Sequence, residues 1–89
     1  MKKIEDALTE YINVLAEGTS YANDRHVYEG HLANAAIMFA IVHGGEPLSR
    51  LKEKIAEERH NYGWGYLQGS AGEAVEAAFH KFATLIESL

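Results

Sequence analysis

Cysteine is absent from this chain of 89 residues, and proline, basic residues and long apolar segments are scarce. The absence of cysteine excludes disulfide bonds and thiolate metal sites, and it is typical of proteins in a reducing cytoplasm. The longest apolar segment, residues 32–42, is shorter than the roughly 20 residues that a membrane-spanning helix needs. The amino-terminal segment contains acidic residues early and no continuous apolar region, so we expect no signal peptide. We therefore expect a cytoplasmic protein without a membrane segment.

Basic residues are outnumbered by acidic ones. The chain has 8 Lys and Arg residues against 13 Asp and Glu residues, which gives a formal net charge of −5. Generic binding to the phosphates of nucleic acids requires a basic surface. We therefore do not expect a nucleic-acid partner, although a local basic pocket for a small anion is compatible with this charge.

The residues that are present predict one helical domain over residues 1–89. Hydrophobic residues make up 47% of the chain and charged residues 24%, which are ordinary values for a globular protein. Apolar residues recur at spacings of three and four, the period of an amphipathic helix, over residues 4–17, 21–43, 47–60 and from 70 onward. We expect an all-α fold, a compact bundle of about four helices.

Local signals mark the ends of these helices. Gly18 follows the last apolar turn of the first segment and predicts a helix end, because glycine readily adopts the left-handed conformation. Thr19 or Ser20 then predicts an N-cap for the second helix. Pro47 suits the first position of the third helix. The segment 70–73 begins with Ser and ends with Glu, the pattern of a capping box at the start of the fourth helix.

The segment 32–42 is apolar on every side of its helix except at Asn34. A helix that is apolar all round is usually enclosed on several sides, and a small domain has few elements with which to enclose it. We therefore expect a symmetric homo-oligomer that forms through this helix, with an interface made by Leu32, Ala33, Ala36, Ile37 and Ile41.

The segment 59–69 combines glycines, aromatic residues and Arg59 between two predicted helices. Glycines allow a ligand to approach the backbone, aromatic rings offer stacking faces, and an arginine suits phosphate or carboxylate. The free amides at the start of the following helix also favour an anion. We predict a pocket for an anionic, nucleotide-like ligand, lined by Arg59, His60, Asn61, Trp64, Tyr66 and Ser70. In the alternative interpretation, Trp64 and Tyr66 plug the open end of the bundle.

A second polar cluster lies at the start of the second predicted helix, from Tyr21 to His31. In an oligomer, we expect Tyr21, Arg25 and His26 of a neighbouring chain to complete the ligand pocket. Arg25 and His31 also resemble the Arg-x(4–6)-His motif of HEPN-type ribonucleases, which are all-helical and usually dimeric. That resemblance implies a metal-independent ribonuclease in which Arg25 and His31 act on the scissile phosphate.

Metal and covalent chemistry have weaker support. Glu57 and His60 have the Glu-x-x-His spacing of di-iron bundles, but the sequence has no matching second pair. The carboxylates at Glu53, Glu57, Glu58, Glu73 and Glu76 do not follow the order found in all-helical nucleotide pyrophosphohydrolases. No nucleophile is paired with a base in the sequence. We therefore assign no metal, no cofactor and no catalytic residue.

These observations favour a small non-enzymatic binding protein that captures an anionic, nucleotide-like ligand. Small inhibitors or sponges of phages and mobile elements have this size, and the comparison rests on size alone. One alternative is the HEPN-like ribonuclease that uses Arg25 and His31. Another is an inhibitor whose acidic face covers a basic site on a protein partner.

Overall fold

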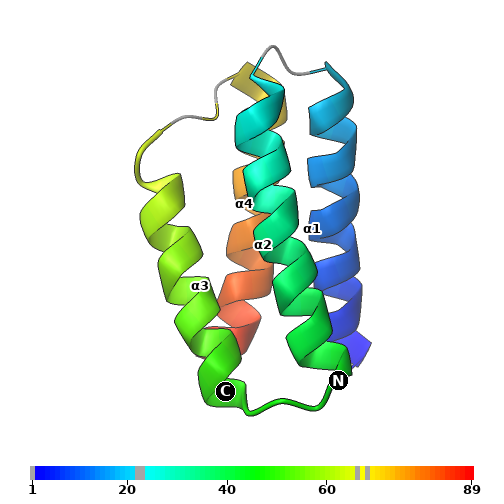
Figure 1. Ribbon diagram of the computed structural model, residues 1–89, viewed down its shortest axis with the longest axis vertical. Helices are drawn as coiled ribbons and strands as arrows, with labels where there is room; N and C mark the ends of the chain where they lie inside the picture. The colour runs from blue at the N-terminus through cyan, green and yellow to red at the C-terminus, as the bar shows by residue number, and fades with distance from the viewer. Residues whose placement is uncertain (1, 22–23, 66, 68) are drawn as a thin grey trace.

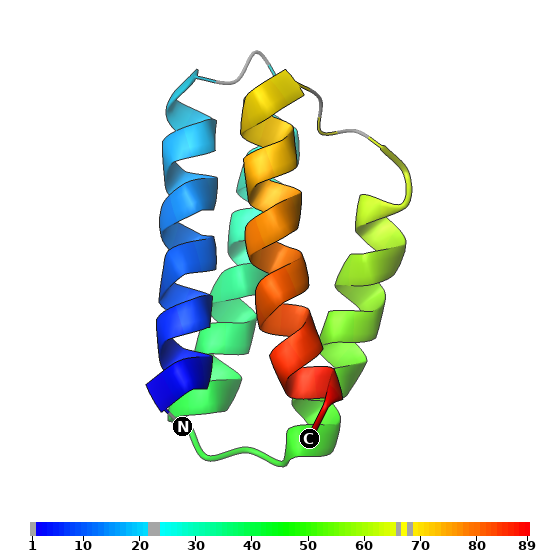
Figure 2. The same cartoon turned by 180° about the vertical axis from the view of Figure 1, so that it is seen from behind.

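The described residues form four antiparallel helices and contain no strand. The computed structural model describes residues 2–21, 24–65, 67 and 69–89. The helices are α1 (Lys2–Tyr21), α2 (Arg25–His43), α3 (Leu48–Tyr62) and α4 (Gly69–Glu87). They run alternately up and down, so that both ends of the chain lie at the same end of the bundle (Figures 1 and 2). The predicted all-α class with about four helices is confirmed.

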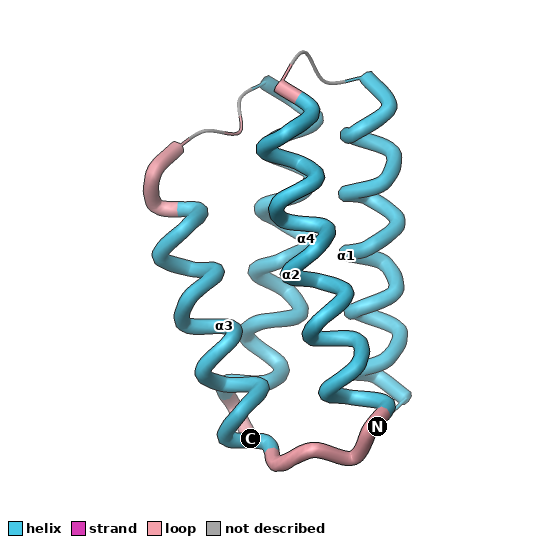
Figure 3. Tube along the Cα trace, in the orientation of Figure 1, coloured by secondary structure: helices cyan, strands magenta, loops and turns pink. Residues whose placement is uncertain are grey.

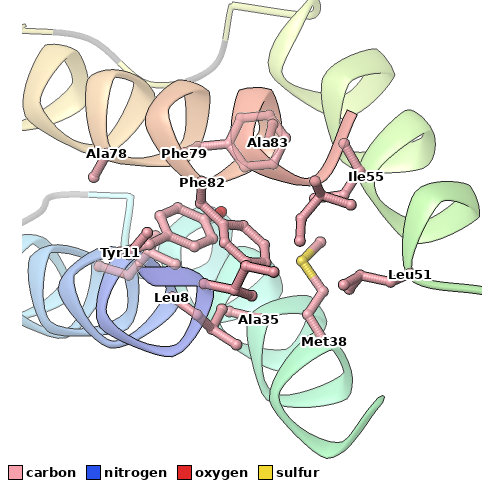
Figure 4. Packing of buried hydrophobic residues seen from close by; sticks show 14 of the residues in the cluster. Leu8, Tyr11, Ala35, Met38, Leu51, Ile55, Ala78, Phe79, Phe82 and Ala83 are labelled. Carbon is pink, nitrogen blue, oxygen red and sulfur yellow. The ribbon is translucent and has the colours of Figure 1, made fainter. Parts of the chain in front are cut away.

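The core lies between α1, α2 and α4, and α3 covers its remaining side (Figure 4). Most of the apolar residues at helical spacing in α1 are buried, with Leu8, Tyr11 and Leu15 each 0% exposed, whereas Ile12 is partly buried. From α4, Phe79 and Phe82 pack against the ring of Tyr11. The apolar spacing of α1 and α4 therefore predicts their buried faces well.

The boundary between α1 and α2 differs from the prediction. Gly18 does not end a helix: α1 continues to Tyr21, and α2 begins only at Arg25. The hydroxyl of Thr19 donates to the carbonyl oxygen of Leu15 within α1, at 2.8 Å, instead of capping α2. Gly18 serves close packing, because a Cβ at this position would lie 2.6 Å from a ring carbon of Tyr28 on α2.

The other two boundaries are shifted by one or two residues. Pro47 is the N-cap of α3, one position before the predicted place, and α3 continues past His60 to Tyr62. α4 begins at Gly69, so that Ser70, the predicted cap, already lies inside the helix. Figure 3 shows the connections between the helices. The connection between α2 and α3 lies at the same end of the bundle as both chain termini.

The apolar segment of α2 is only half enclosed by its own chain. Ala35, Met38 and Ile41 are buried in the core, whereas Ala33, Ala36, Ile37 and Ala40 are exposed. We expect Ile41 at an interface between chains from the sequence, but it is 2% exposed in the single chain and belongs to the core. Leu32, also predicted at that interface, is partly buried and packs against the core.

Gly18→Ala is expected to destabilise the fold by about 1–3 kcal/mol, the usual cost of overpacking. The added methyl group would meet the ring of Tyr28, which is only 5% exposed. The measurement is the free energy of unfolding from a urea titration.

Gly30→Ala is the matched control, because no atom lies within 4 Å of a Cβ added at Gly30. Alanine has the higher helix propensity, so this substitution should stabilise the chain by up to about 1 kcal/mol. Equal stability of the two variants would show that Tyr28 does not pack tightly on Gly18.

Candidate functional site

A buried carboxylate joins α2 to α3. The side chain of Glu58 is 1% exposed, and its two oxygens accept three hydrogen bonds. His31 donates from Nδ1 to Oε2 at 2.8 Å. Asn34 and Asn61 donate from Nδ2 to Oε1, each at 2.6 Å. Burying a carboxylate is costly unless donors replace its water, and these three donors do so.

The helical spacing brings these four side chains together. His31 and Asn34 are three residues apart on α2, and Glu58 and Asn61 are three residues apart on α3. Residues with this spacing lie on the same face of a helix. Two polar pairs therefore face each other where α2 packs against α3, and Glu58 takes the position next to Ile55 in the buried row of α3.

The imidazole of His31 contacts Tyr62 with the face of its ring as well as Glu58 with its edge. Its ring stacks on that of Tyr62, with centroids 4.2 Å apart and an angle of 7° between the planes. Because Nδ1 faces Glu58, Nε2 is the nitrogen that remains for a ligand. The buried carboxylate and the stacked ring thus fix the orientation of an imidazole that lines a pocket.

The pocket lies between the first half of α2 and the end of α3, and its volume is about 260 Å³. Three of the hydrogen-bonded side chains, those of His31, Asn34 and Asn61, line its wall. The full lining is His26, Val27, Gly30, His31, Asn34, Asn61 and Trp64. We call it the α2–α3 pocket.

Three residues predicted to bind a ligand, His26, Asn61 and Trp64, line this pocket together. All three belong to one chain, whereas from the sequence we expect His26 to come from a neighbouring chain. His60 is exposed, and its ring lies edge-on to that of Trp64, with centroids 5.7 Å apart. Trp64 itself is 62% exposed. The interpretation of Trp64 as a plug of the bundle is therefore wrong.

Arg59 lies on another side of α3. Its guanidinium donates from Nε and Nη2 to the two carboxylate oxygens of Glu87, at 2.6 and 2.7 Å, and lies over the ring of Phe79. The hydrogen bonds from Arg59 lower the pKa of the Glu87 carboxyl. Arg59 lines a separate pocket of about 530 Å³ between α3 and α4. The predicted partnership of Arg59 with Trp64 around one ligand is not present.

The remaining predicted residues are spread over the surface. Ser70 is exposed in the first turn of α4. Arg25 is exposed and pairs with Glu29 at 3.8 Å. Arg25 is not among the residues that line the pocket with His31, so the two residues of the HEPN-like motif do not meet there. Tyr66 and the side chain of Tyr21 lie outside the described part of the chain.

Two residues of the site were not assigned from the sequence. Asn34 is the one polar residue within the apolar segment 32–42, and Glu58 continues the spacing of Leu51 and Ile55. A polar residue in an apolar row is a signal for a buried hydrogen-bonded group. Its partner cannot be read from the sequence, because the partner lies on another helix.

Behind the pocket, the hydroxyl groups of Tyr11 and Tyr62 form a hydrogen bond between α1 and α3. Burial raises the pKa of both phenols well above the ordinary value of 10.0, and the nearby carboxylate of Glu58 raises both further. Both hydroxyl groups therefore keep their protons to a higher pH than an ordinary tyrosine does.

No family model matches the sequence, and no curated protein or solved structure matches it either. Within the described part of the chain, no helix is long and apolar enough to cross a membrane. In the same residues, no three His, Asp or Glu side chains are grouped so that they could hold a metal ion. The chemistry of the α2–α3 pocket is therefore the main guide to function.

Glu58→Gln is expected to lower the free energy of unfolding by about 1–3 kcal/mol, the cost of leaving a buried polar group unsatisfied. The amide presents a donor where His31 or an asparagine needs an acceptor. The matched control is Glu57→Gln, because Glu57 is exposed and makes only a surface ion pair with Lys54 among the described contacts. Such pairs contribute at most about 1 kcal/mol. Equal small effects would show that the Glu58 cluster does not stabilise the fold.

Stability is expected to fall as the pH rises above 10.0, the pKa at which an ordinary tyrosine ionises. The unfolded chain then releases protons from Tyr11 and Tyr62, whereas the folded chain retains them. Below this pH, both states keep these protons and the contribution is fully present. The measurement is tyrosinate absorbance followed together with unfolding. Ionisation of all the tyrosines before the helices unfold would contradict the burial of this pair.

Proposed function

We propose that this chain is a non-enzymatic binding protein that holds a nucleotide-like ligand in the α2–α3 pocket. The observation that carries the proposal is an exposed tryptophan beside a polar wall whose side chains are already fixed. Trp64 is the only tryptophan of the chain and is 62% exposed. Asn34, Asn61 and His31 are oriented by their hydrogen bonds to Glu58. Fixed polar groups bind a ligand without losing further conformational entropy.

The size and polarity of the pocket suit one flat heterocycle. Pockets that enclose a whole drug-sized ligand measure about 300–1,000 Å³, and the α2–α3 pocket, at about 260 Å³, would take a single ring system. Asn34 and Asn61 use their Nδ2 groups for Glu58, so their carbonyl oxygens remain as acceptors for the amino group of a base. The indole of Trp64 would supply the stacking face.

The anionic group of the ligand would lie at the amino end of α2. The N-cap residue Asp24 makes no side-chain hydrogen bond to the first turn. The amides there and the helix dipole favour a negative charge. His26 lines the pocket at this end, and Arg25 is exposed beside it. We place the anionic group here and not at Arg59, because the guanidinium of Arg59 is hydrogen-bonded to Glu87.

The ribonuclease alternative has one supporting feature and one opposing feature. A carboxylate that orients a histidine is the arrangement that enzymes use to position a general base, and Glu58 holds His31 in this way. However, Arg25 pairs with Glu29 and does not line the pocket. We therefore favour binding. Two further roles stay proposals: a sponge or inhibitor in phage counter-defence, and an inhibitor that covers a protein partner with its acidic face. The small size and the net negative charge of the chain support them.

Titration with mononucleotides, cyclic nucleotides and ADP-ribose derivatives is expected to identify a ligand that changes the fluorescence of Trp64. Trp64→Ala should then weaken binding, measured by calorimetry, about tenfold to a hundredfold, because stacking contributes about 1–3 kcal/mol per base. His26→Ala should weaken binding of the phosphorylated compound more than that of its nucleoside.

Arg59→Ala is the matched control on the opposite side of α3, and it should leave the affinity unchanged. If Arg59→Ala weakens binding as much as Trp64→Ala does, the ligand occupies the pocket between α3 and α4. If no compound binds, the chain is not a nucleotide-binding protein, and a protein partner becomes the better proposal.

A further inference from the structure

The two asparagines in the wall of the α2–α3 pocket are not free to turn. An asparagine amide both donates and accepts hydrogen bonds, so by itself it does not distinguish an amino group from a keto group. A carboxylate only accepts, and Oε1 of Glu58 accepts from Nδ2 of both Asn34 and Asn61, each at 2.6 Å. Turning either amide by half a turn would place its oxygen against Oε1, acceptor against acceptor. Glu58 therefore holds both amides with the nitrogen toward it and the oxygen away from it.

The two amide oxygens are accessible to a ligand. Among the described residues, no buried side-chain nitrogen or oxygen lacks a hydrogen-bond partner. In this part of the chain, Oδ1 of Asn34 and Oδ1 of Asn61 have no such partner, so both oxygens are exposed to solvent. Both residues are half-buried and line the α2–α3 pocket. By the same argument, Nε2 of His31 is accessible, although His31 as a whole is only 7% exposed.

A wall with two fixed acceptors favours a ligand edge that donates. The exocyclic amino group of adenine, cytosine or guanine carries two hydrogens and can donate to both amide oxygens. Hypoxanthine lacks an amino group, and uracil has a keto oxygen where cytosine has one. Each keeps a ring N–H that can satisfy one amide oxygen, while its keto oxygen, an acceptor, lies beside that N–H. Polar groups that are brought together without a proton between them cost free energy.

We propose that the α2–α3 pocket selects nucleotides whose base carries an exocyclic amino group, and that Glu58 sets this preference by positioning Asn34 and Asn61. The inference rests on the proposed function, because it names the class of base that the nucleotide pocket accepts. It also adds a requirement. A pocket whose asparagines were free to turn would bind amino and keto bases alike, whereas this pocket discriminates between them.

The first test compares matched nucleotides on the unmodified chain by calorimetry. Adenosine and guanosine monophosphates are each compared with inosine monophosphate, and cytidine monophosphate is compared with uridine monophosphate. In each pair, the second compound lacks the amino group of the first. In the pair whose base fits the pocket, the amino compound should bind about tenfold to a hundredfold more tightly, the usual effect of leaving polar groups unsatisfied. The pair that shows the preference identifies the base.

The outcomes separate this inference from the proposed function. Equal affinities within all three pairs, or tighter binding of the inosine or uridine compound, would overturn the inference and leave a nucleotide-binding protein. Binding of none of the five compounds would overturn both.

Alanine variants test whether the asparagines carry the preference. Asn34→Ala should weaken binding of the preferred amino compound and leave the affinity for its partner compound unchanged, because it removes one of the two acceptors. Asn61 still donates to Glu58 in this variant. The matched control is Asn13→Ala, at an exposed position of α1, which should retain both the affinity and the preference. A full preference in Asn34→Ala and in Asn61→Ala would overturn the inference.

Glu58→Gln tests the positioning role. The new amide can donate, so an asparagine can turn its oxygen toward residue 58 and present its nitrogen to the ligand. The preference should therefore fall toward equal affinity for the amino and keto compounds. A purely structural role would weaken both compounds by the same factor, and an unchanged preference would overturn the positioning role. Glu57→Gln, at an exposed position of α3, is the control. If circular dichroism shows that Glu58→Gln does not fold, the two asparagine variants decide.

Discussion

The carboxylate of Glu58 is the constraint on which the α2–α3 half of the structure depends. A buried carboxylate needs donors in place of water, and its three donors come from both helices. The buried residues of α3 are Leu51, Ile55 and Glu58, and Glu58 is the one among them that binds α2 through hydrogen bonds. Apolar contacts tolerate small displacements, whereas three hydrogen bonds to one carboxylate do not. Glu58 therefore fixes how α3 is rotated and shifted relative to α2.

The features of the pocket follow from this constraint. His31, Asn34 and Asn61 satisfy the carboxylate and at the same time form one wall of the α2–α3 pocket. The stacking of His31 on Tyr62, and the hydrogen bond between Tyr62 and Tyr11, extend the polar network to α1. Removal of one member would leave buried groups without partners, so the residues that line the pocket also stabilise the fold.

α2 is apolar on two different sides along its length. Its inner side provides Ala35, Met38 and Ile41 to the core, while Ala33, Ile37 and Ala40 remain exposed on its outer side. A helix that is apolar on both sides is unusual at the surface of a monomer. α2 therefore has one apolar row in the core and a second apolar row on its exposed side.

The sequence by itself determined the number and class of the elements and the buried faces of α1 and α4, because apolar spacing records which side of a helix avoids water. It also named His26, Asn61 and Trp64 as candidates, and these three residues line one pocket in the structure. Only the tertiary structure decided that Arg59 faces Glu87, away from Trp64, that Gly18 accommodates the ring of Tyr28, and that Glu58 joins two helices. The reason is physical: the period of a helix depends on nearby residues, whereas the partner of a polar or small side chain lies on another helix. How the helices are rotated about their axes selects that partner, and this rotation is fixed only when the whole core packs.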